Sequence, residues 1–369
     1  MKYYLIAGEA SGDLHAANLM RALTINDVRA EFRCWGGDRM QAAGGQLVKH
    51  YRELAFMGFA EVLMNLRIIL GNLKMCRADI EAFQPDALIL IDYPGFNMRI
   101  AKWAHARGFK VLYYISPQVW AWKQSRVHKL KRDVDRMICI LPFEQDFYQS
   151  FNLKVDFVGH PLIDAVDQRP VFSESQRKSD LKLDDSKPVI ALLPGSRKQE
   201  IKAMLPAMLR AVRKFSKYQA VLAVAPSQEL DFYHQVADLK GVAMVQGRTY
   251  DLLEVSQVAL VTSGTATLET ALFKVPQVVC YKANWLSYWI ARQLVKVKYI
   301  SLVNLIADRE IVTELIQSDM NGKRLAREME TCLKRKDYFE KAYVELREKL
   351  GGPGASKRAA DIISKEVST

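Results

Sequence analysis

The sequence predicts an α/β protein with two parallel-sheet domains, and three observations support this. Short apolar runs alternate with helical stretches along most of the 369 residues, which is typical of parallel strands covered by helices on both faces. At about 150 residues per domain, the length favours two domains. A polar segment at 168–187 interrupts the alternation and is the best linker candidate. We therefore expect domains at 1–167 and 188–345.

In the first half, helical patterns are expected at Asp13–Leu23 and over most of Phe56–Phe83, with a further helix between the strands near 91 and 110. Continuous apolar runs of this length are typical of strands buried on both faces. The expected strands are Tyr3–Ala7, Glu31–Trp35, Ala87–Ile91, Lys110–Ile115, Arg136–Ile140 and Val155–Val158.

The same alternation restarts after the linker. A glycine-rich turn at 351–354 then precedes a last helix, and we expect the segment 346–369 to pack on the N-terminal domain or on a partner. Ligands of parallel sheets bind at the carboxyl ends of the strands, so candidate residues are sought there. The expected strands of this half are Val189–Leu193, Ala220–Ala225, Val242–Val245, Val258–Val261 and Gln277–Cys280.

Composition limits the class of protein and of partner. Half of the residues are hydrophobic and a quarter are charged, which argues against a disordered, collagenous or small disulfide-stapled protein. The net charge is +12, and Met98–Arg136 alone holds ten Lys or Arg against two acids. This excess favours an anionic partner such as phosphate, nucleic acid or an acidic membrane, although a solvated helix face is the plainer alternative.

Cysteine usage and hydropathy bear on location. The five cysteines form no CxxC pair, so we expect a reduced, cytoplasmic protein without a disulfide framework. No stretch approaches the roughly 18 uncharged apolar residues that a spanning helix needs. Any contact with a membrane is therefore expected to be peripheral.

Two strand ends in the first half carry candidate residues. Glycines around Glu9 and Ser11 let the backbone approach a ligand, but the GxGxxG pattern of dinucleotide sites is absent and a plain turn remains the alternative. Asp92 follows the strand Ala87–Ile91, where its carboxylate could take a proton from a hydroxyl. The alternative for Asp92 is a turn or helix-cap residue before Pro94.

The loop after the next strand is rich in aromatic residues. Trp120, Trp122 and Arg126 lie in YYISPQVWAWKQSR, residues 113–126. Aromatic walls suit sugars and acyl chains, and the alternative is a loop anchored by buried tryptophans.

The second half has two turns that suit phosphate. Ser196 and Arg197 follow a strand and precede a helix, so backbone amides, the helix dipole and the guanidinium could hold an anion. The other turn runs from Thr262 to Glu269, and Glu269 could accept hydrogen bonds from a ribose diol. Together the two turns favour a nucleoside diphosphate.

The most apolar stretch is Phe56–Cys76, in which apolar residues are flanked by Lys and Arg. Such a helix either belongs to the core or docks on a membrane and holds acyl chains. We expect no metal site, because the six histidines are scattered and Asp133-Val134-Asp135 enters a strand rather than leaving one. The residues proposed for lipid contact in this stretch are Met57, Phe59, Val62 and Leu66.

Nine motifs together resemble the lipid A disaccharide synthases, glycosyltransferase family 19. They run in order from residue 3 to about residue 310. The motifs are GEASGD (8–13), MGFAEVL (57–63), IDYPGFN (91–97), SPQVWAWKQSR (116–126), LPFE (141–144), FVGHP (157–161), LLPGSRKQEI (192–201), SGTATLE (263–269) and YISLVNLIA (299–307).

The resemblance implies a GT-B fold, in which two Rossmann-like domains face each other across a cleft. The implied enzyme is an inverting, metal-independent and cofactor-free hexosyltransferase. It would move 2,3-diacylglucosamine from UDP-2,3-diacylglucosamine to 2,3-diacylglucosamine 1-phosphate (lipid X). The products would be a β-1,6-linked disaccharide 1-phosphate and UDP, made at the cytoplasmic face of the inner membrane of Gram-negative bacteria.

The resemblance also implies roles for single residues. Asp92 would be the general base on the acceptor 6-hydroxyl, with Glu9 as the competing base and Ser11 in the same cleft. Arg197 would bind the diphosphate, and Glu269 would bind the ribose. Gly95 stands where many members have a second aspartate, which leaves that acid without a counterpart here. Further donor-site residues would be Ser196, Ser263, Gly264, Thr265 and Asn304, the last without an assigned role.

Two other classes stay open at this point. A UDP-sugar epimerase of the same fold would need soluble substrates and no amphipathic helix. A non-enzymatic protein that binds nucleic acid or a membrane surface would leave Asp92, Arg197 and Glu269 unexplained. We expect the two lipid substrates and the inner-membrane surface as partners, no nucleic acid, and a homodimer.

Overall fold

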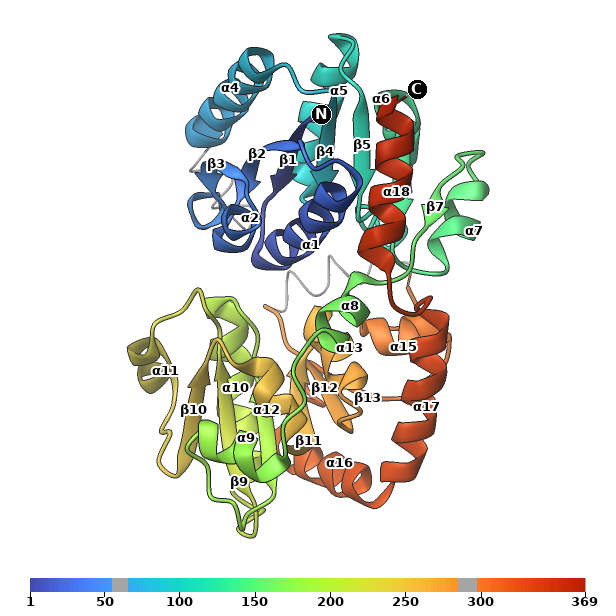
Figure 1. Cartoon of the computed structure of the whole chain (residues 1–369). Coiled ribbons are helices and arrows are strands. Elements are labelled where there is room, and N and C mark those ends of the chain that lie inside the picture. Colours follow the sequence, from blue (N-terminus) through green and yellow to red (C-terminus); the bar gives the residue numbers. More distant parts are fainter. Residues whose placement is uncertain (55–65, 285–296, 369) are drawn as a thin grey trace. The chain divides into compact units, whose positions relative to one another are not determined.

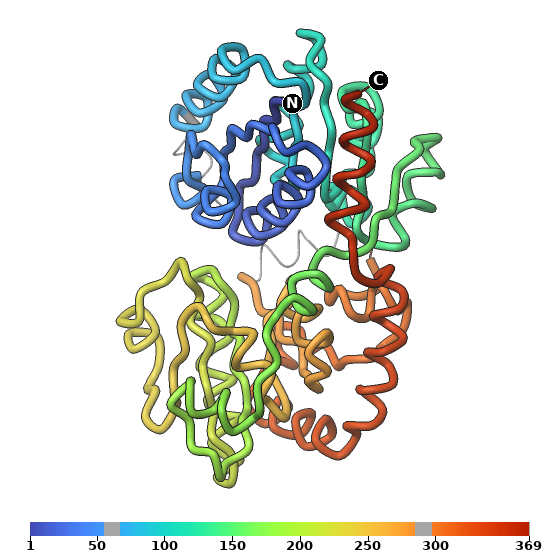
Figure 2. The backbone as a smooth tube through the Cα atoms, in the orientation of Figure 1, coloured from blue at the N-terminus to red at the C-terminus, as the bar shows by residue number. Residues whose placement is uncertain are grey.

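The computed structural model describes residues 1–54, 66–284 and 297–368. The chain forms two compact units: Met1–Asp164 together with Leu350–Thr369, and Ala165–Lys349. The backbone passes from the first unit to the second after Asp164 and returns at Leu350 (Figure 2). Each unit has its own parallel sheet, which confirms the predicted α/β class.

The sheet of the first unit has seven strands in the order β3-β2-β1-β4-β5-β6-β7 (Figure 1). All its pairings are parallel. The strands are β1 (Lys2–Ala7), β2 (Glu31–Gly36), β3 (Gln46–His50), β4 (Ala87–Ile91), β5 (Val111–Tyr114), β6 (Arg136–Cys139) and β7 (Asp156–Phe157). Of these, the edge strand β3 was not predicted, because its residues are only partly buried and lack a continuous apolar run.

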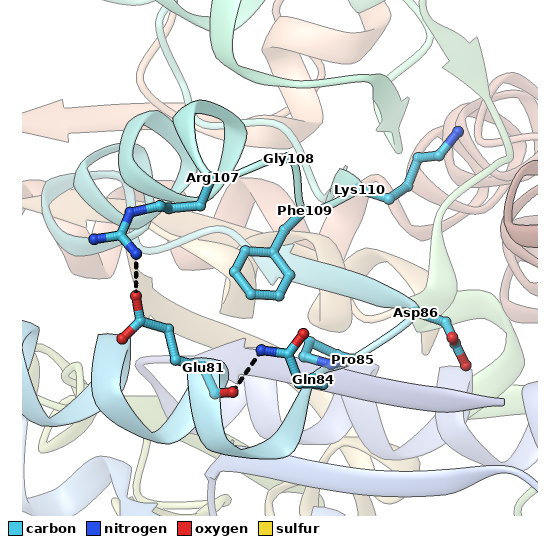
Figure 3. Close-up of a pocket in the computed structure, with 8 residues that line it drawn as sticks. All are labelled: Glu81, Gln84, Pro85, Asp86, Arg107, Gly108, Phe109 and Lys110. Carbon is cyan, nitrogen blue, oxygen red and sulfur yellow. Dashed lines mark hydrogen bonds and ion pairs between the residues drawn. The ribbon is translucent and has the colours of Figure 1, made fainter.

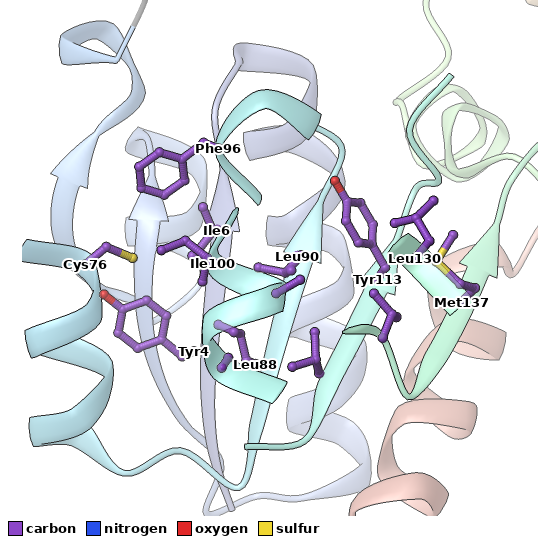
Figure 4. Close-up of a cluster of buried hydrophobic side chains, with 14 of the residues drawn as sticks. Tyr4, Ile6, Cys76, Leu88, Leu90, Phe96, Ile100, Tyr113, Leu130 and Met137 are labelled. Atoms are coloured by element: carbon purple, nitrogen blue, oxygen red, sulfur yellow. The ribbon is translucent and has the colours of Figure 1, made fainter. Parts of the chain in front are cut away.

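Helices cover this sheet and supply the rest of the core. Figure 4 shows side chains from β1, β4 and β5 meeting those of the neighbouring helices, among them Tyr4, Leu88, Tyr113, Cys76 and Ile100. The helices of this unit are α1 (Ala10–Asn26), α2 (Asp38–Ala42), α4 (Leu66–Phe83), α5 (Pro94–Ala106), α6 (Val127–Asp133), α7 (Glu144–Gln149) and α18 (Ala355–Ser368), with the 3-10 turns η1 (Tyr51–Glu53) and η2 (Gln124–Arg126). Helix α8 (Pro161–Asp167) begins in this unit and ends in the second.

The sheet of the second unit has six strands in the order β10-β9-β8-β11-β12-β13, again all parallel. The strands are β8 (Val189–Leu193), β9 (Gln219–Val224), β10 (Val242–Gln246), β11 (Ser256–Thr262), β12 (Gln277–Tyr281) and β13 (Thr313–Ile316). The helices are α9 (Glu174–Asp180), α10 (Lys198–Val212), α11 (Leu230–Val236), α12 (Thr249–Glu254), α13 (Thr265–Leu272), α15 (Leu302–Ala307), α16 (Gly322–Lys334) and α17 (Lys336–Lys349). The sequence did not predict β13, a four-residue edge strand that contains Glu314.

The segment expected to be a linker, 168–187, belongs to the second unit and contains α9. Arg177 on α9 is buried, and its Nε donates to Glu254 Oε2 at 2.5 Å. Arg169 makes ion pairs with Asp251 and with Glu254, both on α12. Two of the charges in this polar segment, Arg169 and Arg177, are therefore paired with acids of α12 in the same unit.

The C-terminal segment returns to the first unit, where α18 packs along α1. Asp164 on α8 is buried and accepts hydrogen bonds from the backbone amides of Gly354, through Oδ1, and Ser356, through Oδ2, at the start of α18. Arg358 on α18 donates through Nε to the Val158 carbonyl at 2.8 Å. Asp164 therefore caps a helix that is about 190 residues away in sequence.

We predict that Asp164→Ala releases the start of α18. Loss of both acceptors leaves two helix amides unpaired, which costs about 1–2 kcal/mol of unfolding free energy. Hydrogen exchange of the Gly354–Arg358 amides, followed by mass spectrometry, should be faster in this variant.

Asp167→Ala is the matched control, because Asp167 lies on the same helix and pairs with a half-exposed Arg347. We expect it to change unfolding free energy by less than about 1 kcal/mol and to leave exchange at 354–358 unchanged. Equal effects of the two substitutions would contradict the capping role.

Candidate active site

The candidate residues of the first unit lie at the carboxyl ends of β1, β4 and β5. Glu9 follows β1 and immediately precedes α1, and Ser11 lies in the first turn of that helix. Asp92 follows β4, and Trp120 lies in the loop after β5. Because the three strands are adjacent and parallel, these residues are brought to one edge of the sheet.

The backbone at Asp92 and Tyr93 is left-handed, with φ values of 44° and 47°. Three hydrogen bonds hold Asp92: its carbonyl accepts from Tyr113 Oη at 2.6 Å and from Asn97 Nδ2 at 2.8 Å, and its amide donates to the Ile115 carbonyl at 3.2 Å. Left-handed backbone in residues other than glycine costs about 1–3 kcal/mol and is concentrated at functional sites. The turn therefore marks Asp92 as a functional candidate.

Gly8 makes room for this turn. A Cβ at Gly8 would lie 2.3 Å from Cγ of Tyr93, closer than any real contact. Only glycine at this position lets the β1–α1 connection pass so near the Tyr93 ring.

Asp92 and Glu9 are electrostatically coupled. Burial is the main cause that raises the pKa of Asp92 to about 7, and the negative charge of Glu9 raises it further, while a hydrogen bond from the Tyr93 amide opposes the change. A carboxyl group with this pKa can accept a proton near neutral pH.

The two tryptophans of the β5–α6 loop have different environments. Trp120 is 8% exposed and its Nε1 donates to Glu144 Oε1 at 3.3 Å. Trp122 is 38% exposed, and the cations of Lys123 and Arg126 lie 4.5 and 5.1 Å from its ring centre. Trp120 therefore anchors the loop, and Trp122 with its two cations forms a surface that suits an anionic, partly apolar ligand.

In the second unit, Ser196 and Arg197 lie between β8 and α10. Glu200 Oε2 accepts from the amides of Ser196 and Arg197 at 3.3 and 3.4 Å, and Glu200 Oε1 pairs with the half-exposed Arg197 guanidinium at 3.3 Å. Gly195 has a φ of 104°, and a Cβ there would lie 2.5 Å from Glu200 Oε2. This tight turn presents amides and a guanidinium at a helix start, a combination that binds phosphate.

The second candidate turn follows β11. Ser263 donates through its hydroxyl to the Ile300 carbonyl at 2.8 Å, Gly264 precedes α13, and Thr265 is its first residue. Glu269, one turn into α13, accepts from Tyr250 Oη at 2.8 Å. Tyr250 is a residue that sequence reasoning missed, because only the fold brings α12 beside α13.

Asn304 uses all four of its hydrogen-bonding positions within the protein. Its Nδ2 donates to the Val312 carbonyl and to Glu314 Oε1, and its Oδ1 accepts from the amides of Ile311 and Val312, at 2.7–2.9 Å. The side chain is fully buried. An amide with two donors and two acceptors already in use has nothing left for a ligand, so the structure gives Asn304 a supporting position.

Part of the expected lipid-contact set cannot be placed. Met57, Phe59 and Val62 lie outside the described residues, and for Leu66 only the backbone is described, as the first residue of α4. Farther along α4, Ile68, Leu70 and Met75 are 49%, 55% and 40% exposed. Exposed Arg67 directly precedes Ile68, and exposed Lys74 directly precedes Met75.

The Asp133-Val134-Asp135 sequence makes contacts within the first unit. Asp133 receives two hydrogen bonds from Arg132, at 2.6 and 2.7 Å, and Asp135 accepts from the Val111 amide at 2.7 Å. Among the described residues, no group of three or more His, Cys, Asp or Glu side chains is arranged to hold a metal ion.

A polar cavity of about 600 Å³ lies elsewhere, beside the starts of β4 and β5 (Figure 3). The ion pair between Arg107 and Glu81 spans 2.7 Å at this cavity, and Phe109 points into it. It lies at the amino ends of strands whose carboxyl ends carry the candidates, so it contains none of the residues predicted from the sequence.

Comparisons with known proteins show the family of the chain. A profile of the family described as "Lipid-A-disaccharide synthetase" matches residues 3–367. The chain is 41% identical over 366 residues to the "Lipid-A-disaccharide synthase" of Syntrophus aciditrophicus, covering 96% of this chain and 95% of the relative. It is 40% identical over 368 residues to that of Geobacter sulfurreducens, covering 97% of this chain and 95% of the relative.

Solved structures show the same fold at low sequence identity. A UDP-GlcNAc 2-epimerase from Neisseria meningitidis matches with a TM-score of 0.71 at 13% identity, covering 99% of this chain and all of that one. The glycosyltransferase of kitacinnamycin matches with a TM-score of 0.68 at 16% identity, covering 99% of this chain and 98% of that one. The fold is thus GT-B, and the full-length sequence matches show that the chain is a glycosyltransferase that belongs to the lipid-A-disaccharide synthetase family.

Proposed function

We propose that this glycosyltransferase moves 2,3-diacylglucosamine from UDP-2,3-diacylglucosamine to the 6-hydroxyl of lipid X, with inversion at the sugar C1. The observation that carries the proposal is the left-handed turn that holds Asp92, whose pKa is about 7, at the carboxyl end of β4. A carboxylate held there is suited to take a hydroxyl proton near neutral pH. The family relationship over nearly the whole chain supports the substrate class.

On the acceptor side, Asp92 is the general base. As the acceptor oxygen forms its bond to C1 of the donor sugar, the hydroxyl proton passes to Asp92 and the bond between C1 and the UDP oxygen breaks. Burial raises the pKa of Asp92, and the charge of Glu9 raises it further. Ser11, on the first turn of α1, lies at the same strand end as Glu9 and is proposed to bind the acceptor.

On the donor side, the developing negative charge falls on the UDP diphosphate. Arg197 and the amides at the start of α10 are proposed to hold it, with Ser196, Ser263, Gly264 and Thr265 as further donors. The Arg197–Glu200 pair is half-exposed, and such pairs are worth only about 0–1 kcal/mol, so a diphosphate can compete for the guanidinium. Glu269, oriented by Tyr250, is proposed to accept hydrogen bonds from the ribose.

Asn304 is proposed to support the donor site without contacting the ligand. It holds Glu314, which also accepts from the amides of Ile300 and Ser301 at 2.9 and 3.0 Å. The Ile300 carbonyl in turn accepts the hydroxyl of Ser263. This chain of contacts fixes the turn after β11.

A peripheral position on the cytoplasmic face of the inner membrane is part of the proposal. In the described ranges, no helix is long and apolar enough to cross a membrane. The exposed apolar residues of α4, accompanied by Arg67 and Lys74, suit the surface of an anionic bilayer.

A homodimer is a separate proposal. Light scattering of the purified protein would measure its mass in solution.

We predict turnover when the protein is mixed with both lipid substrates in detergent and EDTA. Each transfer releases one UDP and one disaccharide, so the two products should appear in equal amounts. The reaction should proceed in EDTA, because the groups assigned to the diphosphate are protein groups. UDP without disaccharide would indicate hydrolysis or epimerase-like chemistry. Activity that appears only with added magnesium would contradict the metal-independent mechanism.

Two substitutions test the assigned roles in that assay. Asp92→Asn should lower kcat by about 10²–10⁴-fold, the range for loss of a general base. Arg197→Ala should lower kcat by about 10²–10³-fold through lost stabilisation of the leaving group.

The contrary outcomes differ for the two variants. Full activity in Asp92→Asn would move the base role to Glu9. Full activity in Arg197→Ala would refute the diphosphate assignment.

We predict that Glu9→Gln shifts the acid limb of the kcat/KM pH profile to lower pH. A base whose pKa is about 7 is ionised only above that pH, so wild-type activity should rise as pH rises through 7. Removal of the Glu9 charge lowers the pKa of Asp92, and burial still keeps it above 3.8. Glu81→Gln, beside the distant polar cavity, is the control and should leave the limb in place.

We predict that the double variant Ile68→Asp/Met75→Asp binds weakly to vesicles containing anionic phosphatidylglycerol. Each exposed apolar side chain that enters the bilayer surface contributes about 1.5–3 kcal/mol, so binding measured by flotation should fall at least about tenfold. Val344→Asp on α17 replaces a similarly exposed residue, 42% against 49% for Ile68, and should bind like the wild type. Unchanged binding of the double variant would argue against docking through α4.

A further inference from the structure

Glu144 is a buried carboxylate for which the proposed reaction has no role. It is the first residue of α7, and only 1% of the residue is exposed. Its Oε2 accepts from the amides of Ile140 and Leu141 at 3.1 and 2.9 Å, and its Oε1 accepts from Trp120 Nε1 at 3.3 Å. A carboxylate so enclosed does not reach a bound substrate, so any function acts through the groups it holds.

Burial of a charged carboxylate at Glu144 is energetically unfavourable. Burial raises its pKa to about 7, and the hydrogen bonds from Leu141, Ser116, Ile140 and Trp120 oppose this change. A buried carboxylate is tolerated only when such donors satisfy it. A glutamine would keep one acceptor oxygen and bring two N–H donors, so it could not accept from the amides after β6 and from the indole together.

The groups that α7 holds belong to the loop between β5 and α6. Trp120 is bound by Glu144 and packs edge-on against Phe143, with ring centres 5.0 Å apart. Ser116, earlier in the loop, shares a short hydrogen bond with the buried Tyr148 of α7. The loop is therefore fixed at two points from one helix.

This loop connects the candidate base to the exposed aromatic residue. At its start, the Ile115 carbonyl accepts the amide of Asp92. Beyond Trp120 it carries Trp122, with Lys123 and Arg126 against the ring. An aromatic face with two cations suits a sugar or acyl chain that bears a phosphate.

We propose that Glu144 is a positioning residue for the acceptor: by fixing Trp120, it holds the surface formed by Trp122, Lys123 and Arg126 in place for an acylated sugar phosphate. This inference rests on the proposed function, because it assigns the surface to the acceptor of that reaction. It predicts an effect on the acceptor and none on the UDP-sugar, whose proposed residues lie in the other unit.

The test is steady-state kinetics of Glu144→Gln with each substrate varied in turn. We expect the KM for lipid X to rise about tenfold, the scale of one lost buried hydrogen bond to a charged group, and kcat to change less than threefold. The KM for UDP-2,3-diacylglucosamine and the affinity for UDP should not change. Asp146→Asn removes an exposed acid from the same helix and should match the wild type in every parameter.

Trp120→Phe is the second variant and keeps the proposal testable if Glu144→Gln does not fold. It removes the indole N–H, so it should raise the same KM, and the double variant should be no worse than the stronger single one. Labelling with 5-fluorotryptophan adds a direct readout, since the Trp120 fluorine resonance should move in Glu144→Gln while the circular dichroism spectrum stays unchanged.

An active wild type whose two variants keep the normal KM for lipid X would overturn this inference and leave the proposed function intact. Equal increases in both substrate KM values would also overturn it, because they would indicate a general loss of structure. A folded wild type that forms no disaccharide would overturn the proposed function and this inference together.

Discussion

The candidate site of the first unit depends on one strained piece of backbone, the left-handed turn at Asp92 and Tyr93. The turn is maintained because the fold satisfies it from several sides: Asn97 and Tyr113 donate to the Asp92 carbonyl, and the missing side chain of Gly8 admits the Tyr93 ring. The consequence is a carboxylate held half-buried near a second one, the condition under which its pKa rises to about 7. The contacts that fix the turn therefore also create the environment that raises the pKa of Asp92.

A second feature recurs in both units: a carboxylate that accepts hydrogen bonds from neighbouring backbone amides of a loop. Asp13 does so for the turn after β2, and Glu144 for the residues after β6. Glu200 and Glu314 do so for the loops at Ser196 and Ile300. Loop amides have no partner in a sheet or helix, and a carboxylate can satisfy two at once. These acids are therefore best understood as supports of functional loops, and Asn304 with its saturated amide belongs with them.

Particular residues show which parts of the fold and of the candidate site could be predicted from the sequence. The central strands were predictable because each is a continuous apolar run, whereas β3 and β13 lie at sheet edges and lack that signal. The position of Asp92 followed from its place after β4, but its coupling to Glu9 and its left-handed backbone depend on contacts among three strand ends. Tyr250 and Glu314 gave no local signal, because their partners are 10 or more residues away or lie on another element. Glu144 lies in the LPFE motif, but its contact with Trp120 joins residues 24 positions apart and depends on the fold. The segment 168–187 looked like a linker for the same reason, since the acids that pair with Arg169 and Arg177 are on α12.

The cations of the segment Met98–Arg136 fall into two groups, those that pair with acids in the described part of the chain and those that do not. Arg107, Lys110, Arg132 and Arg136 are paired with acids, so they contribute little to the field outside the protein. The remaining six cations make no ion pair with any described residue: Arg99, Lys102, Lys123, Arg126, Lys129 and Lys131. Two of them, Lys123 and Arg126, lie against the exposed ring of Trp122. At Lys123 and Arg126, positive charge therefore coincides with an exposed aromatic ring. This combination favours an anionic amphiphile over a purely ionic ligand such as free phosphate.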